Sequence, residues 1–342
     1  MLVLGIEGTA HTFAVGIVDD KGNILVNARD VYKPEKGGIH PLKAGEHHAV
    51  VASNVFENAV AAAAEKLGCS TDEIVNKIEF IAYSAGPGLA PCLRATLEFA
   101  RTIAKQHSKL LMPVNHCIAH VEIARQMTGA KDPIVLYVSG GNTQVIGFAA
   151  GKYRVFGETL DIAVGNAIDT FMREAGGEFP GGPVMERLAA QARTAKGDSA
   201  YVELPYVVKG MDLSFSGIVT AALQKLKKGA ALDDVCFSFQ ETCYAMLTEV
   251  TERAMAHTGK NECVLTGGVA ASKRLQEMLH IMCEERGAKF FVCPMELAGD
   301  CGANIAWAGV MAERGGEQLL EPDKADFNVK WRTDDVDVRW MK

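Results

Sequence analysis

Two histidines four residues apart, His116 and His120, have the spacing of a pair of metal ligands. Side chains four positions apart on a helix lie on the same face, with Cβ atoms roughly 5–6 Å from each other, so both imidazoles can reach one ion. The apolar, strand-like stretch 110–114 precedes them, which places the pair where a strand ends and a helix begins. α/β proteins bind their ligands at that edge of the sheet. Two polar residues at a helix start are the alternative interpretation, and both stay open on spacing alone.

A third ligand has to come from elsewhere in the chain, and Asp300 is the best candidate. It lies between a predicted strand and the next predicted helix, where an Asp also commonly caps the helix. Two imidazoles and one carboxylate leave coordination positions open, as a catalytic site requires, and they suit iron or zinc. Tyr137, near the end of another predicted strand, is a further candidate ligand that would favour iron. Its alternative role is that of an ordinary half-buried aromatic residue.

Three glycine-containing turns, 5–8, 139–142 and 266–270, each follow a predicted strand. Glycine lets backbone N–H groups approach phosphate oxygens. None of the turns matches the P-loop or the dinucleotide-binding turn, and one such turn alone would be weak evidence. Three of them favour a nucleotide site. Asp169 is placed to bind a ribose, although a solvated helical Asp explains it equally well.

The composition indicates a cytoplasmic protein long enough for two domains. The 342 residues are 48% hydrophobic, carry a net charge of −7 and include nine cysteines, with no Cys-x-x-Cys pair, which indicates reduced thiols. An acidic chain that handles RNA needs local basic patches or basic partners. No apolar run approaches the ~18–20 residues of a membrane span. The start of the chain, residues 1–7, reads as a strand and not as a signal peptide.

Two stretches, 2–25 and 133–156, share a pattern of strand, glycine-containing turn, strand. Such a repeat suggests two like domains, although two hairpins can resemble each other by chance. Periodicity predicts an α/β protein with a helical insertion of about 165–258 and a domain boundary near 128–132. The helices predicted by periodicity and composition are 47–67, 94–107, 166–174, 183–195, 217–227, 232–258, 272–283 and 303–312.

Nine motifs, taken in order, resemble the family of tRNA N6-adenosine threonylcarbamoyltransferases, long described as O-sialoglycoprotein endopeptidases. They are 5–12, 37–41, 86–89, 116–120, 137–145, 158–169, 181–183, 267–271 and 300–303. The stretch 8–12, Gly-Thr-Ala-His-Thr, is most similar to the archaeal and eukaryotic branch, the catalytic subunit of the KEOPS complex. The resemblance extends from Met1 to about residue 334.

The resemblance implies an α/β, actin-like fold of the sugar kinase and Hsp70 type, with two duplicated domains around a nucleotide cleft and a helical insertion. The expected domains are 1–130, completed by a C-terminal helix at 303–342, and 131–302. The implied reaction transfers a threonylcarbamoyl group from threonylcarbamoyl-AMP to N6 of adenosine 37 in tRNAs that read ANN codons. Since no Ser-His-Asp or Cys-His set is visible, we expect direct transfer without a covalent enzyme intermediate.

The resemblance also implies ligands and partners. His116, His120 and Asp300 would hold one divalent metal ion, iron or zinc, with Tyr137 as an additional ligand. The residues expected to bind the adenylate, or ATP, are Tyr137, Val138, Ser139, Gly140, Gly141, Asp169, Gly182, Glu186 and Ser272. The family commonly has Asn in place of Ser272, and a hydroxyl cannot present the paired donor and acceptor of an amide. The expected partners are tRNA and KEOPS subunits, including a small protein kinase/ATPase and a small dimerising subunit. No association with a membrane is expected.

Other functions fit parts of the pattern. A metalloprotease has the same histidine spacing, but it needs a glutamate directly after the first histidine, where this chain has Cys117. A non-catalytic ATP-binding or ATPase module would bind nucleotide without needing His116. A sugar kinase or small-molecule carbamoyltransferase could use the same fold.

Overall fold

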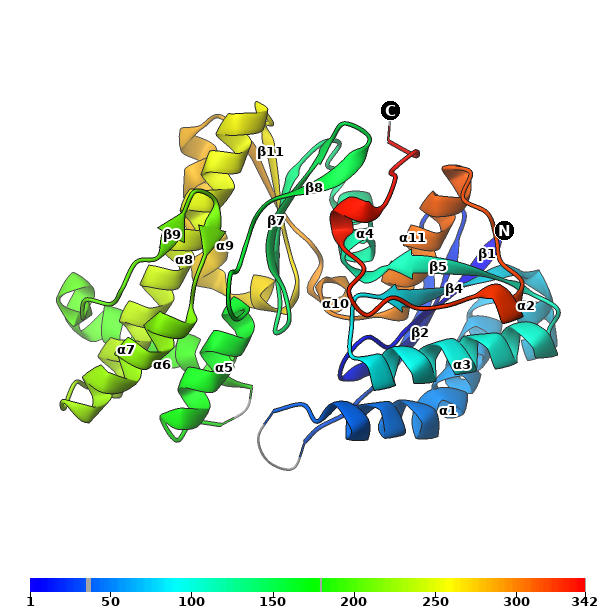
Figure 1. The fold of residues 1–342 in the computed structure, drawn as a ribbon, viewed down its shortest axis with the longest axis horizontal. Coiled ribbons are helices and arrows are strands. Elements are labelled where there is room, and N and C mark those ends of the chain that lie inside the picture. Colours follow the sequence, from blue (N-terminus) through cyan, green and yellow to red (C-terminus); the bar gives the residue numbers. More distant parts are fainter. Residues whose placement is uncertain (35–37, 179, 342) are drawn as a thin grey trace. The chain divides into compact units, whose positions relative to one another are not determined.

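The computed structural model of the chain describes residues 1–34, 38–178 and 180–341, so Gly37 of the motif 37–41 lies outside the described residues (Figure 1). The chain divides into two compact units. Unit 1 comprises Met1–Gln126, Ala149–Tyr153 and Asp300–Lys342, and unit 2 comprises Met127–Phe148 and Arg154–Gly299. Each unit has its own hydrophobic core. No helix in the described part of the chain is both long enough and apolar enough to cross a membrane.

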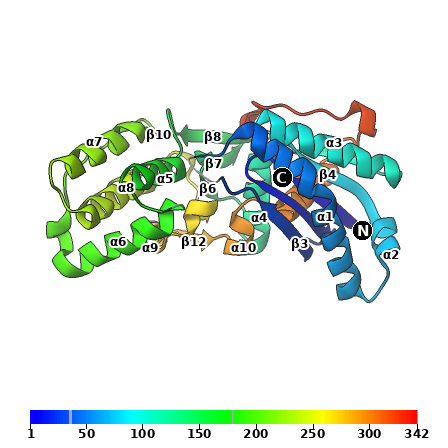
Figure 2. The same cartoon turned by 90° about the horizontal axis from the view of Figure 1, so that it is seen from below.

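Unit 1 is built on a five-stranded sheet in the order β3-β2-β1-β4-β5. Its strands are β1 (Leu2–Glu7), β2 (Thr12–Asp19), β3 (Ile24–Val31), β4 (Ile78–Gly86) and β5 (Leu110–Asn115). Strands β1, β2 and β3 form an antiparallel meander, and β4 and β5 continue the sheet parallel to β1. The helices of this part are α1 (Pro41–Leu67), α2 (Thr71–Lys77), α3 (Ala90–Gln106), α4 (His116–Thr128) and α11 (Gly302–Arg314). Helices α1 and α3 lie side by side on the sheet (Figures 1 and 2).

Glycines in unit 1 let α11 lie directly on the sheet. A Cβ at Gly5 of β1 would lie 2.2 Å from the backbone N of Ala306, and a Cβ at Gly16 of β2 would lie 2.2 Å from that of Ala303. Successive side chains of a strand point to opposite faces, so Leu4 and Ile6 point away from α11 and pack into the core. This close packing fixes the start of α11, two residues after Asp300.

Unit 2 repeats the strand order of unit 1. Its sheet runs β12-β11-β6-β7-β8, with β6 antiparallel to β7 and parallel to β11. The strands of this sheet are β6 (Ile134–Val138), β7 (Thr143–Ala149), β8 (Lys152–Glu158), β11 (Glu262–Thr266) and β12 (Lys289–Val292). In both units the first strand is central, a meander lies on one side and two parallel strands lie on the other. The shared order confirms the duplication predicted from 2–25 and 133–156.

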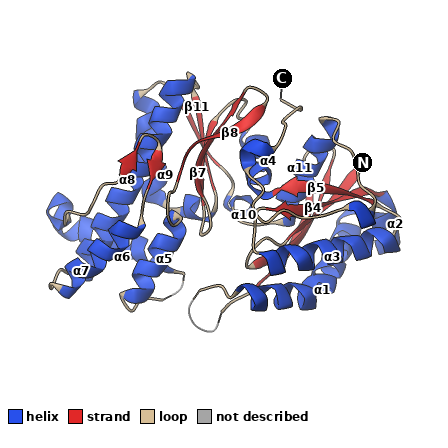
Figure 3. Cartoon of the chain, viewed as in Figure 1, coloured by secondary structure: helices blue, strands red, loops and turns tan. Residues whose placement is uncertain are grey.

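Along the chain, the helical insertion lies between β8 and β11 (Figure 3). Between these strands lie α5 (Val164–Glu174), α6 (Gly181–Lys196), α7 (Ser216–Lys227), α8 (Leu232–Thr258) and the short pair β9 (Val208–Lys209) and β10 (Asp212–Leu213). Helix α8 has fifteen buried residues, so it forms the centre of this core. Helices α9 (Lys273–Glu285) and α10 (Met295–Ala298) complete the unit.

Two sequence-based expectations differ from the structure. The helix expected over 303–342 ends at Arg314, because Gly315 and Gly316 follow and Gly316 has a φ of +84°. Beyond them, the only helical segments among the described residues are the short 3₁₀ turns Pro322–Lys324 and Thr333–Asp335. Helix α1 begins at Pro41, six residues before the predicted start, because proline suits the first turn of a helix.

Candidate metal and nucleotide sites

Helix α4 carries the histidine pair, and the residue before it determines where it begins. Asn115 ends β5, and its Oδ1 accepts hydrogen bonds from the backbone N–H groups of Cys117 (3.0 Å) and Ile118 (3.2 Å). These are two of the donors that a helix start leaves unsatisfied. His116 and His120 therefore lie on the first two turns of α4, and both are buried.

The tertiary structure brings Asp300 to the histidine pair. Its Oδ1 lies 3.3 Å from Nε2 of His120 and 3.6 Å from Nε2 of His116. One ligand atom from each residue lies within 4.8 Å of the other two. Ligands bound at about 2 Å in a tetrahedral site are separated by roughly 3.3 Å. The three residues therefore fit a shared metal ion.

Asp300 does not cap α11. The cap position of that helix is Cys301, and no side-chain capping bond is present there. The Asp300 carboxylate instead faces histidines, including His11, whose Nδ1 lies 3.9 Å from Oδ2. The helix-cap interpretation is therefore wrong, and His11 is a neighbour of the site that the sequence reasoning did not single out.

Glu7 is a second residue that the sequence reasoning missed. Its Oε2 lies 3.0 Å from Nδ1 of His116, and its Oε1 accepts hydrogen bonds of 2.7 Å from the N–H and hydroxyl of Thr9. The Glu7 side chain is 1% exposed, so it has few alternative partners. A carboxylate that accepts from Nδ1 makes Nε2 the nitrogen that can bind a metal, the usual arrangement of a ligand histidine. The sequence signal that could have identified Glu7 was its position in the first glycine-containing turn, 5–8.

The charges of this group are strongly coupled. Burial opposes the charged form of His116, but the charge and hydrogen bond of Glu7, together with Asp300, raise its pKa to about 9. Burial also opposes ionisation of Asp300, yet the hydrogen bond from His120 and the neighbouring His116 hold its pKa well below its usual range. Burial, aided by the charge of His116, lowers the pKa of His120. The site therefore stabilises an anionic carboxylate beside its imidazoles.

In unit 2, the predicted nucleotide residues gather at the carboxyl ends of β6 and β11. Ser139 closes the turn after β6, because its hydroxyl accepts from the N–H groups of Gly141 and Asn142. Two glycines fit tightly against this turn: a Cβ at Gly165 would lie 2.5 Å from the carbonyl O of Ser139, and one at Gly267 would lie 2.1 Å from that of Val138. By contrast, a Cβ at Gly140 or Gly141 would meet no atom within 4 Å. This edge has space for a ligand beside exposed backbone.

Two predicted carboxylates of the nucleotide site support helix starts. Asp169 Oδ1 accepts the N–H of Gly181, the first residue of α6, at 2.8 Å. Glu186 Oε1 accepts the N–H of Lys273, the first residue of α9, at 2.7 Å. These contacts link α5, α6 and α9.

The other predicted nucleotide residues lie beside these helix starts. A Cβ at Gly182, the second residue of α6, would meet no atom within 4 Å. Ser272 occupies the cap position of α9 and is 6% exposed. Tyr137 lies in β6 of unit 2 and is fully buried, with its hydroxyl accepting from Nδ2 of Asn142 at 3.5 Å. Its role as a metal ligand stays a prediction.

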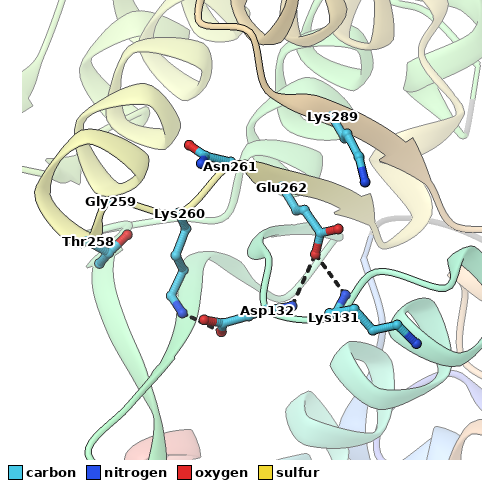
Figure 4. A pocket seen from close by; sticks show the side chains of 8 residues that line it. All are labelled: Lys131, Asp132, Thr258, Gly259, Lys260, Asn261, Glu262 and Lys289. Carbon is cyan, nitrogen blue, oxygen red and sulfur yellow. Dashed lines mark hydrogen bonds and ion pairs between the residues drawn. The ribbon is translucent and has the colours of Figure 1, made fainter.

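A cavity of about 390 Å³ lies at the other edge of the unit 2 sheet, where β6, β11 and β12 begin (Figure 4). Its polar groups bind one another: Glu262 accepts from the backbone N–H groups of Lys131 and Asp132, and Lys260 pairs with Asp132. The remaining lining residues are Thr258, Gly259, Asn261 and Lys289. α/β proteins place ligands at the carboxyl ends of strands, so this cavity is separate from the predicted nucleotide site.

Sequence comparisons identify relatives over nearly the whole chain. A family model described as tRNA N6-adenosine threonylcarbamoyltransferase matches residues 23–307. The chain is 53% identical to a protein of that name from Thermococcus kodakarensis, over 99% of this chain and 100% of that protein. It is 51% identical to another from Archaeoglobus fulgidus, with the same coverage. A probable bifunctional tRNA threonylcarbamoyladenosine biosynthesis protein from Methanothermobacter thermautotrophicus is 52% identical, and the chain spans 61% of its length.

Solved structures with similar folds are much more distant in sequence. HypF from T. kodakarensis aligns with a TM-score of 0.63 and 14% identity, over 92% of this chain and 48% of that chain. An activator of 2-hydroxyisocaproyl-CoA dehydratase from Clostridium difficile, with bound ADPNP, aligns with a TM-score of 0.52 and 10% identity, over 93% and 97%. Both share the actin-like, sugar-kinase type of α/β fold, and the likeness confirms the predicted fold class.

Proposed function

Since this chain belongs to the tRNA N6-adenosine threonylcarbamoyltransferase family, we propose that it transfers a threonylcarbamoyl group from threonylcarbamoyl-AMP to N6 of adenosine 37 in tRNAs that read ANN codons. The convergence of His116, His120 and Asp300 carries the proposal. These residues come from two distant parts of the chain, and their ligand atoms are as close as one shared ion requires.

The chemistry of the acceptor explains why activation is needed. An exocyclic adenine amine is a poor nucleophile, so the carbamoyl carbon must arrive as a mixed anhydride with AMP. The new bond joins N6 to that carbon, the bond from the carbon to the phosphate oxygen breaks, and N6 loses a proton. A metal ion held by the three residues would supply Lewis-acid polarisation of the carbonyl or a grip on the threonyl end.

The chain's own residues position the metal ligands and bind the adenylate. Glu7 holds the His116 ring with Nε2 turned toward Asp300. The backbone at Val138, Ser139, Gly140 and Gly141, together with Gly182 and Ser272, would bind the adenylate or ATP. Asp169 and Glu186 would contribute carboxylate oxygens to the same binding site. We assign iron or zinc to the metal, with Tyr137 as an additional ligand.

We also propose partners and a compartment for the reaction. The target adenine is reached in a single-stranded tRNA loop, and the net charge of −7 leaves much of the tRNA binding to KEOPS subunits, including a small protein kinase/ATPase and a small dimerising subunit. The bifunctional relative supports such an association. None of the nine cysteines forms a disulfide, which agrees with the cytoplasm.

The proposal is tested by reconstitution. The purified chain, tRNA, threonine, bicarbonate, ATP, the adenylate-making enzyme and the partner subunits should yield threonylcarbamoyladenosine on nucleoside analysis. His116→Ala should abolish the product. Full product formation by His116→Ala, or none by the wild-type chain under these conditions, would overturn the assignment.

The alternatives make different predictions. A protease would cleave glycoproteins in a His116-dependent way, but the residue after His116 is Cys117, and the carboxylate of Glu122 is buried and occupied by other side chains. A non-catalytic ATP-binding module would keep its function in His116→Ala. A threonylcarbamoyl-enzyme seen by mass spectrometry would contradict direct transfer.

A further inference from the structure

Glu122 is a buried carboxylate that the proposed reaction does not use. It lies on α4, two residues after His120, and is 1% exposed. Residues are spaced by about 100° around a helix, so Glu122 points roughly opposite to His120. A buried carboxylate needs charged or hydrogen-bonding partners. The partners of Glu122 therefore show what holds the face of α4 that lies opposite His120.

The partners of Glu122 include the end of the chain. Its Oε1 accepts hydrogen bonds from Nε1 of Trp340 (2.7 Å) and the hydroxyl of Tyr153 (2.5 Å), and its Oε2 accepts from Arg125 (2.8 Å). Tyr153 is buried beside Met341. Residues far apart in sequence thus meet on one face of α4.

The same C-terminal segment also holds the start of α4. Asn115, which caps the helix through Oδ1, donates through Nδ2 to the carbonyls of Trp331 (3.2 Å) and Arg332 (3.4 Å). Just upstream, the N–H of Asn328 donates to Ala85 at 2.7 Å. We call residues 328–341 the C-terminal strap.

Between these two contacts, the strap is attached to the β7–β8 hairpin within unit 1. The N–H of Val338 donates to the carbonyl of Gly151 at 2.8 Å, and Lys152 pairs with Asp337 at 3.2 Å. The strap therefore has a defined path from the cap of α4 to its second turn.

We propose that the C-terminal strap positions the metal-ligand helix, and that Trp340 and Glu122 are positioning residues for His116 and His120. This inference rests on the proposed function, because it takes the histidine pair to be metal ligands. The strap holds α4 at its cap and on the face opposite His120, so a loosened strap lets the helix shift relative to Asp300. Ligand groups have to be held within about half an ångström to bind well.

Cobalt(II) provides a test that does not depend on transferase activity. Full-length protein is stripped of metal with a chelator and titrated with cobalt(II), and its visible absorption reports ligand geometry. Trp340→Phe removes the indole donor but keeps a ring, and Glu122→Gln removes the charge but keeps an acceptor. Both variants should bind cobalt(II) about tenfold more weakly than wild type, within the range of groups that support metal ligands, and with an altered spectrum.

Two reference variants distinguish a failure of the strap inference from a failure of the metal assignment. Arg339→Ala changes an exposed strap residue and should match wild type, whereas His116→Ala should lose cobalt(II). Wild-type affinity and spectrum in Trp340→Phe and Glu122→Gln overturn the strap inference and leave the proposed function intact. A lower melting temperature with an unchanged spectrum also overturns it, because the role would then be only structural. Full retention of cobalt(II) by His116→Ala overturns the metal assignment itself.

Discussion

At the scale of single residues, the proposed metal site depends on groups beyond its three ligand residues. Glu7 determines which nitrogen of His116 faces Asp300, through a contact of 3.0 Å in a buried environment. Thr9 holds the same carboxylate from the other side. A ligand histidine without such a partner can rotate or change tautomer, which weakens metal binding.

We therefore predict that Glu7→Gln weakens metal binding by about 10- to 100-fold. The amide keeps the shape of the carboxylate but removes its charge, so it favours the Nδ1–H tautomer of His116 less strongly. Metal content after dialysis against a graded chelator series measures the effect. Glu79→Gln, an exposed change on β4, is the control. Equal metal retention by the two variants would contradict the role of Glu7.

At the scale of elements, two glycines of unit 2 have opposite surroundings. Gly165 packs against the carbonyl of Ser139, whereas Gly182 borders open space. We predict that Gly182→Val leaves the melting temperature nearly unchanged but weakens binding of a non-hydrolysable ATP analogue at least about tenfold, since its side chain takes the ligand's space. Gly165→Val should lower the melting temperature. Isothermal titration measures the affinity of both variants for the analogue, and thermal melts measure their melting temperatures. Unchanged analogue binding in Gly182→Val would mean that the nucleotide binds elsewhere.

Helix α1 contributes a pH-sensitive contact to the first glycine-containing turn. His48 is fully buried against Phe13 and next to His47, within the field of Glu7 and His11. Burial, reinforced by the charge of His47, lowers its pKa from 6.5 to about 4, so the folded protein binds this proton less readily than the unfolded chain. The stability from neutral His48 is fully present above pH 6.5 and is lost as the pH falls through about 4.

That difference in pKa amounts to about 3 kcal/mol. We predict that His48→Gln, which cannot take up a proton, loses less stability than wild type between pH 7 and pH 4, by up to this amount. Urea denaturation at a series of pH values measures it. His280→Gln, on an exposed histidine, should follow wild type. Parallel pH profiles for wild type and His48→Gln would rule out the effect.

At the scale of the whole molecule, His116, His120 and Asp300 belong to unit 1, whereas the proposed nucleotide-binding residues belong to unit 2, and each unit has its own core. Ligand binding stabilises the elements that it contacts, by about 2.7 kcal/mol at a hundredfold excess over Kd. We predict that metal slows amide hydrogen exchange mainly in α4 and around Asp300, and that an ATP analogue slows it mainly in 138–141, 181–186 and 267–273. Exchange mass spectrometry distinguishes the two patterns. Protection by the analogue confined to unit 1 would contradict the nucleotide assignment.

Local patterns determined much of this molecule. The spacing of His116 and His120 fixed their shared helix face, the helix over 232–258 was predicted with both ends correct, and the repeat of strand, turn and strand predicted the duplicated sheets. These features depend on neighbours in sequence, on side-chain periodicity and on turn chemistry. The domain division at 1–130 and 131–302 stays a prediction.

Only the tertiary structure decided which distant residues meet. The partnership of Glu7 with His116, the approach of Asp300 to both histidines and the return of Trp340 to Glu122 join residues more than a hundred positions apart. No local pattern encodes such contacts, because they follow from how whole helices pack on the sheet. The expected helix over 303–342 was wrong for a related reason: the chain beyond Arg314 is held by contacts with β4, α4 and the β7–β8 hairpin instead of by helical periodicity.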